Sequence, residues 1–184
     1  MLRKLTFFVL STTIALFPSG AVALSHGKTL QNLGMNEIMF AQGMIPHHEQ
    51  ALTMSELALK KSKNQSILKL SNQIKAMQQA EVSQLTYWLT ATKSSMTMDH
   101  EMHMAGMLTD KELAALQQLS GDKFDKKFLD FMIKHHQGAI EMLALLKGSK
   151  NQEARSLAKS IKAGQSEEIT KMKKLLNKLN KGDK

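Results

Sequence analysis

The sequence predicts an all-α fold, a four-helix bundle assembled from two copies of one helical hairpin. Apolar residues recur with the spacing of amphipathic helices, and no stretch alternates convincingly with the period of two that a half-buried strand shows. The segment MIPHHEQALTM at residues 44–54 recurs as MIKHHQGAIEM at residues 132–142. Because one hairpin cannot bury its apolar face alone, the two copies are expected to pack together as a bundle.

The repeat continues beyond these segments into the helices that follow them. After a one-residue deletion, KSKNQ at residues 61–65 matches GSKNQ at residues 148–152. Further pairs then correspond in the partner helices: Ile74 with Ile161, Gln78 with Gln165, Glu81 with Glu168, and Leu85 with Met172. Each copy therefore predicts a histidine-bearing helix, a short turn and a second helix.

Residues 1–23 have the composition of a cleavable signal peptide. A basic MLRK segment precedes the apolar run LTFFVLSTTIALF, and Ala21-Val22-Ala23 matches an A-x-A cleavage site. The apolar run is shorter than the roughly 20 residues that a membrane-spanning helix needs, and no later stretch reads as a membrane span. We expect cleavage after Ala23 and a periplasmic or secreted protein.

The net positive charge could suggest a partner such as nucleic acid or anionic lipid, and the methionine content favours soft metal ligands. Lys and Arg number 25 against 16 acidic residues, but the C-terminal lysines are spaced along an amphipathic helix, where they are expected to form a solvated face. We therefore expect no nucleic-acid partner. The chain has 14 methionines and no cysteine. In an oxidising compartment, thioether sulfur is then the soft ligand that remains.

The bundle is expected to cover residues 34–184 as one domain, after a flexible N-terminus at residues 24–33. The first hairpin, residues 34–91, contains predicted helices at residues 34–61 and 65–91. The KSKN segment joins these two helices.

A Met/His-rich connection at residues 92–108 joins the two hairpins. Thr109 and Glu112 have the S/T-x-x-E spacing of a capping box, which predicts a short helix at residues 109–121. The second hairpin covers residues 122–180, with helices expected at residues 123–147 and 152–180.

Each copy of the repeat sets two adjacent histidines between two methionines. At 100° per residue, Met44, His47 and Met54 share one helix face with small Ala51, and His48 lies just beside it. A Met and a His at this spacing can converge on one ion, and a facing helix could complete the site. The candidate ligands are Met44, His47, His48 and Met54 in the first copy, and Met132, His135, His136 and Met142 in the second. The alternative is that these side chains only pack and hydrogen-bond in the core.

Harder metals and hydrolytic chemistry fit these motifs poorly. A di-iron bundle uses Glu-x-x-His, but methionine or isoleucine stands three residues before each of the four helical histidines. The HHEQAL segment also lacks the second histidine of H-E-x-x-H, because Leu52 occupies its place. No other nucleophile–base motif or phosphate-binding loop is present, and we expect a protein that is not an enzyme.

The connection contains a dense run of soft ligands, MTMDHEMHMAGM at residues 96–107. With Gly106 and acidic residues interspersed, it is unlike a buried helix, so its methionines are expected to sit partly in water. Thioethers and neutral imidazoles suit Cu(I), and by similarity Ag(I), far better than Mg²⁺ or Ca²⁺. The candidate ligands here are Met96, Met98, His100, Met102, His103, Met104 and Met107.

These motifs resemble the family catalogued as domain of unknown function 305, and especially its Met/His-rich periplasmic copper-binding proteins of the CopM type. The resemblance rests on FAQGMIPHHEQALTM, on the segment from GMLTDKELAAL to HHQGAIEM, and on the Gln/Glu pairs of the partner helices. It implies a ferritin-like four-helix bundle that binds Cu(I) and Ag(I) and protects the cell from copper. Carried over, it points to the same eight helical residues and to the connection.

The leading hypothesis is a periplasmic protein that sequesters or carries Cu(I), in copper resistance or homeostasis, with a copper-exporting or copper-accepting envelope protein as its partner. The alternative is a structural or interaction bundle of the cell envelope that binds no metal. An oxidoreductase is disfavoured, because redox copper sites usually add a cysteine thiolate.

Two further expectations concern histidine. Cleavage after Ala23 would place His26 third from a free amine, where amine, backbone amides and imidazole could enclose Cu(II) in a square plane. Because an unperturbed histidine titrates near 6.5, sites that use imidazole are expected to weaken through that pH region.

Overall fold

The structure is a computed structural model that describes residues 33–98 and 104–182. Within these ranges the chain is helical and contains no strand, so the predicted all-α fold is confirmed. The elements are α1 (Met35–Lys61), α2 (Gln65–Ala91), α3 (Asp110–Gln118), α4 (Gly121–Met142), the 3-10 helix η2 (Leu143–Leu146) and α5 (Gln152–Gly182).

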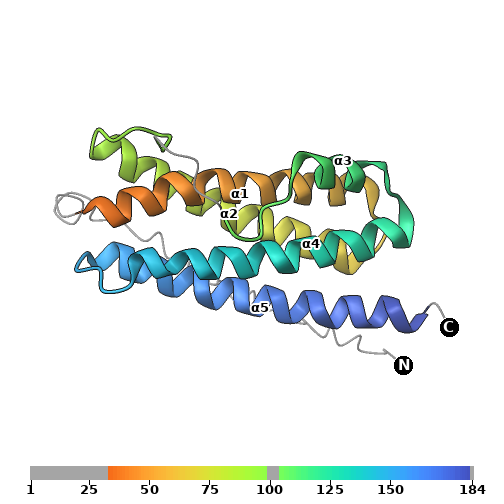
Figure 1. Ribbon diagram of the computed structural model, residues 1–184. Helices are drawn as coiled ribbons and strands as arrows, with labels where there is room; N and C mark the ends of the chain where they lie inside the picture. The colour runs from red at the N-terminus through yellow and green to blue at the C-terminus, as the bar shows by residue number, and fades with distance from the viewer. Residues whose placement is uncertain (1–32, 99–103, 183–184) are drawn as a thin grey trace, which may run out of the picture.

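The four long helices form an elongated bundle of two hairpins. In Figure 1, α1 and α2 lie together above α4 and α5, and the short α3 lies at one end of the bundle. The most extensive contacts are within each hairpin, and the hairpins meet chiefly where α1 packs against α4. The two histidine-bearing helices of the repeat are thus neighbours.

The helix ends follow local sequence signals in most places. The capping box expected at Thr109 is present. The Thr109 hydroxyl accepts a hydrogen bond from the Glu112 backbone N–H, and the Glu112 carboxylate accepts one from the Thr109 backbone N–H. The helix expected at residues 123–147 instead ends at Met142 and tightens into η2. A helix commonly tightens into a 3-10 turn where it ends, and here the chain then turns at Gly148, whose φ is +81°.

Two hydrophobic clusters build the core. One contains Met54, Phe124, Phe128 and Met132, and the other contains Phe40, Met44, Leu85, Trp88 and Met142. Along both α1 and α4, the histidine pair separates the residues that belong to one cluster from those that belong to the other. The bundle therefore has two apolar halves with a polar layer between them.

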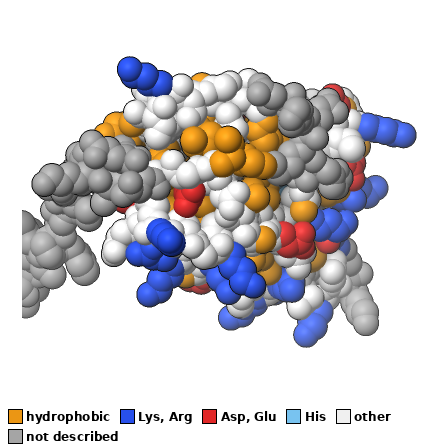
Figure 2. Space-filling view, turned by 60° about the vertical axis from the view of Figure 1, so that its left-hand side comes forward, with side chains coloured by type: hydrophobic (Ala, Val, Ile, Leu, Met, Phe, Trp, Pro, Cys, Tyr) orange, Lys and Arg blue, Asp and Glu red, His pale blue; other side chains and the backbone are white. Residues whose placement is uncertain are grey.

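The surface is mixed in character. Figure 2 views the molecule with the end at which α1 begins brought forward; hydrophobic side chains gather near the middle of this face, and Lys and Arg side chains lie around its lower part. Among the described residues, no helix has the length and apolar character that crossing a membrane requires.

Candidate metal centre

Four fully buried histidines lie at the contact between α1 and α4. His47 and His48 come from α1, and His135 and His136 come from α4. The rings of His47 and His135 face each other across the helix contact, with centroids 3.9 Å apart and planes tilted by 41°. We call His47, His48, His135 and His136 the histidine layer.

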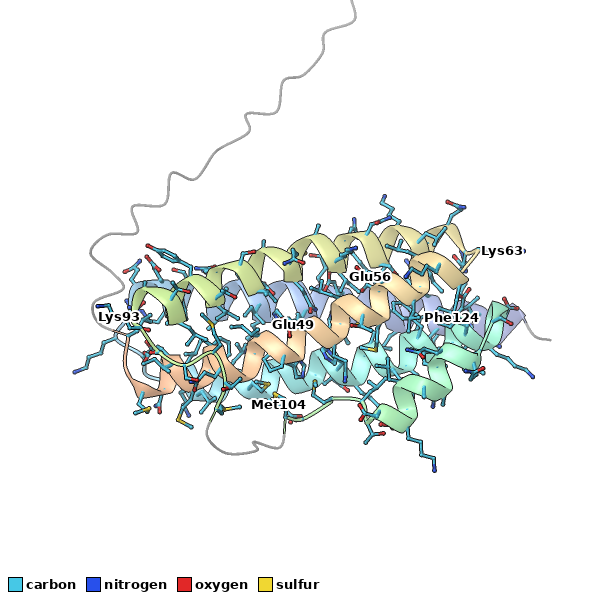
Figure 3. The ribbon with its side chains drawn as sticks, turned by 90° about the horizontal axis from the view of Figure 1, so that it is seen from above. Glu49, Glu56, Lys63, Lys93, Met104 and Phe124 are labelled. Carbon is cyan, nitrogen blue, oxygen red and sulfur yellow. The ribbon has the colours of Figure 1, made fainter. Side chains whose placement is uncertain are left out.

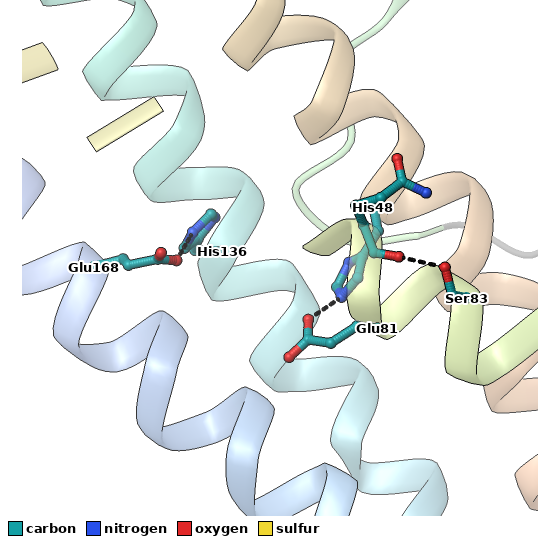
Figure 4. Close-up of polar contacts among 6 residues, drawn as sticks. His48, Glu81, Ser83, His136 and Glu168 are labelled. Atoms are coloured by element: carbon teal, nitrogen blue, oxygen red, sulfur yellow. Dashed lines mark hydrogen bonds and ion pairs between the residues drawn. The ribbon is translucent and has the colours of Figure 1, made fainter. Parts of the chain in front are cut away.

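Two members of the histidine layer are held by carboxylates from the partner helices. His48 Nε2 lies 2.8 Å from an oxygen of Glu81 on α2, and His136 Nε2 lies 2.8 Å from an oxygen of Glu168 on α5. Figure 4 shows His48 directed at Glu81 and His136 at Glu168. Because a carboxylate accepts, we assign a proton to Nε2 of both rings, and their Nδ1 atoms make no hydrogen bond among the described residues.

The connection supplies the acceptor for a third histidine. His47 Nε2 donates to the backbone carbonyl of Ala105 at 3.0 Å, so the same assignment applies to its ring. The Nδ1 atoms of His47, His48 and His136 and both ring nitrogens of His135 are buried without a hydrogen-bond partner within the described part of the chain. A buried acceptor without a partner costs about 1–3 kcal/mol. A nitrogen of this kind that carries a lone pair could hold a metal ion.

Burial keeps the rings of His47 and His135 neutral. It lowers the pKa of His47 to about 4, with the Ala105 carbonyl opposing the shift and His48 and His136 adding to it. Burial, followed by the neighbouring histidines, lowers the pKa of His135 well below its ordinary value. The expectation that imidazole sites weaken near pH 6.5 is therefore wrong for His47 and His135. Their lone pairs stay available to a metal at lower pH.

The methionines that flank the histidine pairs lie in the core. Met44, Met54 and Met132 are fully buried among apolar side chains, and Met142 is 8% exposed. Their placement is what packing requires, whether or not any of them also binds an ion.

The connection is partly described. Met96 is 45% exposed, and Met98, Met104 and Met107 are half-buried. The remaining predicted ligands, His26, His100, Met102 and His103, lie outside the described residues.

Residues 104–108 lie as a strap across α1 and α4. On α1, the Gln50 side chain donates to the Leu108 carbonyl at 2.9 Å and accepts from the Leu108 N–H at 2.7 Å. On α4, a Cβ added to Gly138 would stand 1.7 Å from the Ala105 carbonyl oxygen, so only glycine permits this contact. The strap brings the Ala105 carbonyl to His47.

Glu81 and Glu168 were not identified as site residues from the sequence. The repeat aligned them with each other, and it aligned His48 with His136, but nothing in the linear pattern connected the two alignments. The usable signal was that both pairs recur at corresponding helix positions. Within the described ranges, no three His, Cys, Asp or Glu side chains are grouped as a metal site would group them.

Comparisons with known proteins show the family and the fold. A family model described as domain of unknown function (DUF305) matches residues 37–176. A DUF305 protein from Streptomyces coelicolor, described as secreted, is 25% identical with a TM-score of 0.76, over 79% of this chain and 94% of that one. A DUF305 fragment from Deinococcus radiodurans is 29% identical with a TM-score of 0.72, over 79% and 97%.

CopM in its Cu(I)-bound form is 30% identical to this chain, with a TM-score of 0.65 over 77% of this chain and 96% of CopM. Structures of CopM bound to silver and to Cu(II) match over the same share of this chain. No curated protein matches the chain.

Proposed function

The chain belongs to the DUF305 family, and from that premise we propose that it is a periplasmic copper-binding protein whose histidine layer binds Cu(I). One observation carries the proposal: the Nδ1 atoms of His47, His48 and His136 are buried and have no hydrogen-bond partner among the described residues. Imidazole is a suitable ligand for copper, and Cu(I) accepts a low coordination number. The similarity to CopM, which has been determined with Cu(I) and silver bound, supports the same reading.

The glutamates have a defined part in this function. A metal-binding histidine commonly donates its other ring N–H to a carboxylate, which orients the ring and raises its basicity. Glu81 and Glu168 stand where such a partner is needed, each 2.8 Å from the far nitrogen of its histidine. The pairs would hold His48 and His136 in place before the ion arrives.

The test is a Cu(I) titration against a competing chelator with the double variant His47→Phe/His135→Phe. Phenylalanine keeps a ring in each position and removes the nitrogens, so Cu(I) binding at the layer should be lost while helicity is retained. Ser71→Ala, which removes a buried hydroxyl from α2, is the matched control and should bind as the wild type does. Wild-type affinity in the double variant would contradict the proposal.

The exposed connection is proposed to add Cu(I) or Ag(I) capacity. Replacing the five methionines within residues 96–107 by leucine should lower the Cu(I) stoichiometry and leave helicity intact, because the described methionines among them are exposed or half-buried. An unchanged stoichiometry would remove the connection from the ligand set. Delivery to a copper-exporting or copper-accepting envelope protein would follow from this exposure.

A bundle that binds no metal remains the second candidate. The two buried His–Glu hydrogen bonds and the core positions of Met44, Met54 and Met132 favour it, since each has a structural purpose by itself. Failure of the wild-type protein to take Cu(I) from the chelator would select this candidate.

A separate Cu(II) site is proposed at the N-terminus if export cleaves the chain after Ala23. Mass spectrometry of exported protein should then show Leu24 as the first residue. Square-planar Cu(II) absorption should appear in the wild type and be absent from His26→Ala. Another N-terminus would remove this site and leave the Cu(I) proposal unaffected.

A further inference from the structure

Gly43 lies in the interior of α1, where glycine costs about 1 kcal/mol of helix stability relative to alanine. A Cβ built on Gly43 would stand 3.1 Å from Met142 Cε, 3.6 Å from Met98 Cε and 3.9 Å from Met104 Sδ. The ends of three methionine side chains, from α4 and from both described parts of the connection, therefore lie within 4 Å of the place where α1 has no side chain. Met104 approaches this place with its sulfur, and Met98 and Met142 approach it with their methyl carbons.

The other copy of the repeat fills the corresponding place. Gly43 directly precedes Met44, whereas Phe131 directly precedes Met132 and is 4% exposed. The counterpart of Met142 is Met54, which is fully buried in the same hydrophobic cluster as Phe131. Packing of the repeat thus works with a phenyl ring at this position, so core packing does not by itself require a glycine surrounded by methionines.

The connection is anchored on both sides of Gly43. Gln42 donates from its side-chain amide to the carbonyls of Ser95 and Thr97, at 2.9 Å and 3.0 Å, which holds the segment leading to Met98. The Ala105 carbonyl accepts from His47, which holds the residue after Met104. Figure 3 shows Met104 on the connection beside α1. Met98 and Met104 are therefore held beside α1 by hydrogen bonds of neighbouring residues.

We propose that Met98, Met104 and Met142 form a second Cu(I) site, made of thioethers alone, beside Gly43. Three neutral sulfur donors select Cu(I) or Ag(I) over harder ions such as Mg²⁺ and Ca²⁺. Methionine side chains are flexible enough to close around an ion from these positions. This inference rests on the proposed copper-binding function and adds to it a second site nearer the surface.

The position relative to the histidine layer gives the site its role. Gly43 and His47 are one helical turn apart on α1, about 6 Å along the axis at 1.5 Å per residue. Met98 and Met104 are half-buried, while the four histidines are fully buried. The thioether site is where an ion exchanges with the outside, and the histidine layer is where it is held.

The first test compares two triple variants in a Cu(I) titration against a competing chelator. Met98→Leu/Met104→Leu/Met142→Leu should bind one equivalent fewer than the wild type and give a weaker Cu–S signal in X-ray absorption. The control, Met35→Leu/Met77→Leu/Met172→Leu, changes two exposed methionines and one buried one. It should keep the wild-type Cu(I) stoichiometry and the wild-type Cu–S signal. Unchanged stoichiometry and Cu–S signal in the first triple variant would overturn the proposal.

The second test leaves every sulfur in place. Gly43→Phe copies the residue of the second repeat into the first, and its ring should occupy the space where the thioethers meet. The same equivalent should be lost, with helicity retained by circular dichroism. Retention of that equivalent in a folded Gly43→Phe protein would overturn the site.

The outcome also separates this site from the histidine layer. A triple variant that loses the Cu–S equivalent and keeps a nitrogen-bound one supports both sites. If only the His47→Phe/His135→Phe change lowers Cu(I) binding, the thioether site is rejected and the proposed function stands. A wild-type protein that takes no Cu(I) removes both.

Discussion

The two hairpins carry the same histidine–glutamate pair but differ in what surrounds it. His48 with Glu81 and His136 with Glu168 have the same 2.8 Å separation and the same burial of the ring. One residue before the shared M-I-x-H-H motif, the first copy has Gly43 and the second has Phe131. In both copies the pair joins the two helices of one hairpin. The flanks differ because a single connection can cover only one side.

The two copies also differ where the strap crosses them. Gln50 and Gly138 occupy equivalent places in the two copies, each directly before an alanine of the repeat. Gln50 binds Leu108 through two hydrogen bonds, while Gly138 leaves room for the Ala105 carbonyl. The histidine and glutamate positions of the two copies thus correspond, while these two positions differ where the connection touches them.

The largest expected effect is on the stability of the metal-free protein in acid, to which both copies contribute. The pKa of His47 falls from 6.5 in the unfolded chain to about 4 in the folded protein, so between these values the unfolded chain binds more protons. Stability is present above pH 6.5 and is lost as the pH falls toward 4, by about 3 kcal/mol for His47 alone. His135, whose pKa is also lowered, should extend the loss.

Urea unfolding at a series of pH values from 7 to 4 measures this loss. Glutamine does not titrate, so the His47→Gln variant should lose less stability in acid than the wild type. The loss that remains should be the one due to His135. A free energy of unfolding that stays level across this range in the wild type would contradict the burial of both rings.

The next effect concerns the strap. Gly138→Ala would put a methyl group 1.7 Å from the Ala105 carbonyl oxygen and 2.3 Å from its carbon, so the strap must move. We expect a destabilisation of about 2–3 kcal/mol, as for overpacked cores, measured by urea unfolding. Gly164→Ala is the control, because its new methyl group meets only the flexible end of Met77. Equal stability of the two variants would show that the strap is not tightly packed.

A smaller effect should separate the equivalent methionines. Met132→Leu and Met142→Leu should each cost less than about 1.5 kcal/mol, because the change nearly conserves volume. Met142 contributes to the thioether site and Met132 lies in the apolar core, so only Met142→Leu should lower copper or silver tolerance in cells at equal protein abundance. Equal tolerance of both variants would favour core packing for Met142 as well.

The smallest effect is expected at Gly43 itself. Gly43→Ala should raise the free energy of unfolding by less than about 1 kcal/mol through helix propensity, because the nearest atom, Met142 Cε, can move aside. Cu(I) affinity at the thioether site should fall, since the methyl group takes part of its space. Loss of stability together with unchanged Cu(I) affinity would reverse both expectations.

The helices were predictable because their signals are local. The two hairpins were expected at residues 34–91 and 122–180, and α1, α2, α4 and α5 lie there or extend only slightly beyond. The capping box at Thr109 was visible in four consecutive residues. The end of α4 was not, because the tightening at Leu143 depends on how the chain turns at Gly148 and enters α5.

The sequence by itself determined an all-α bundle of duplicated hairpins and the residue types in it, since periodicity, caps and repeats are properties of neighbouring residues. Only the tertiary structure decided which atoms are available. Glu81 and Glu168 occupy one nitrogen of their histidines, burial lowers the pKa of His47, and Met98, Met104 and Met142 meet at Gly43. These contacts join residues distant in the chain, so they depend on how the helices pack and where the connection crosses them.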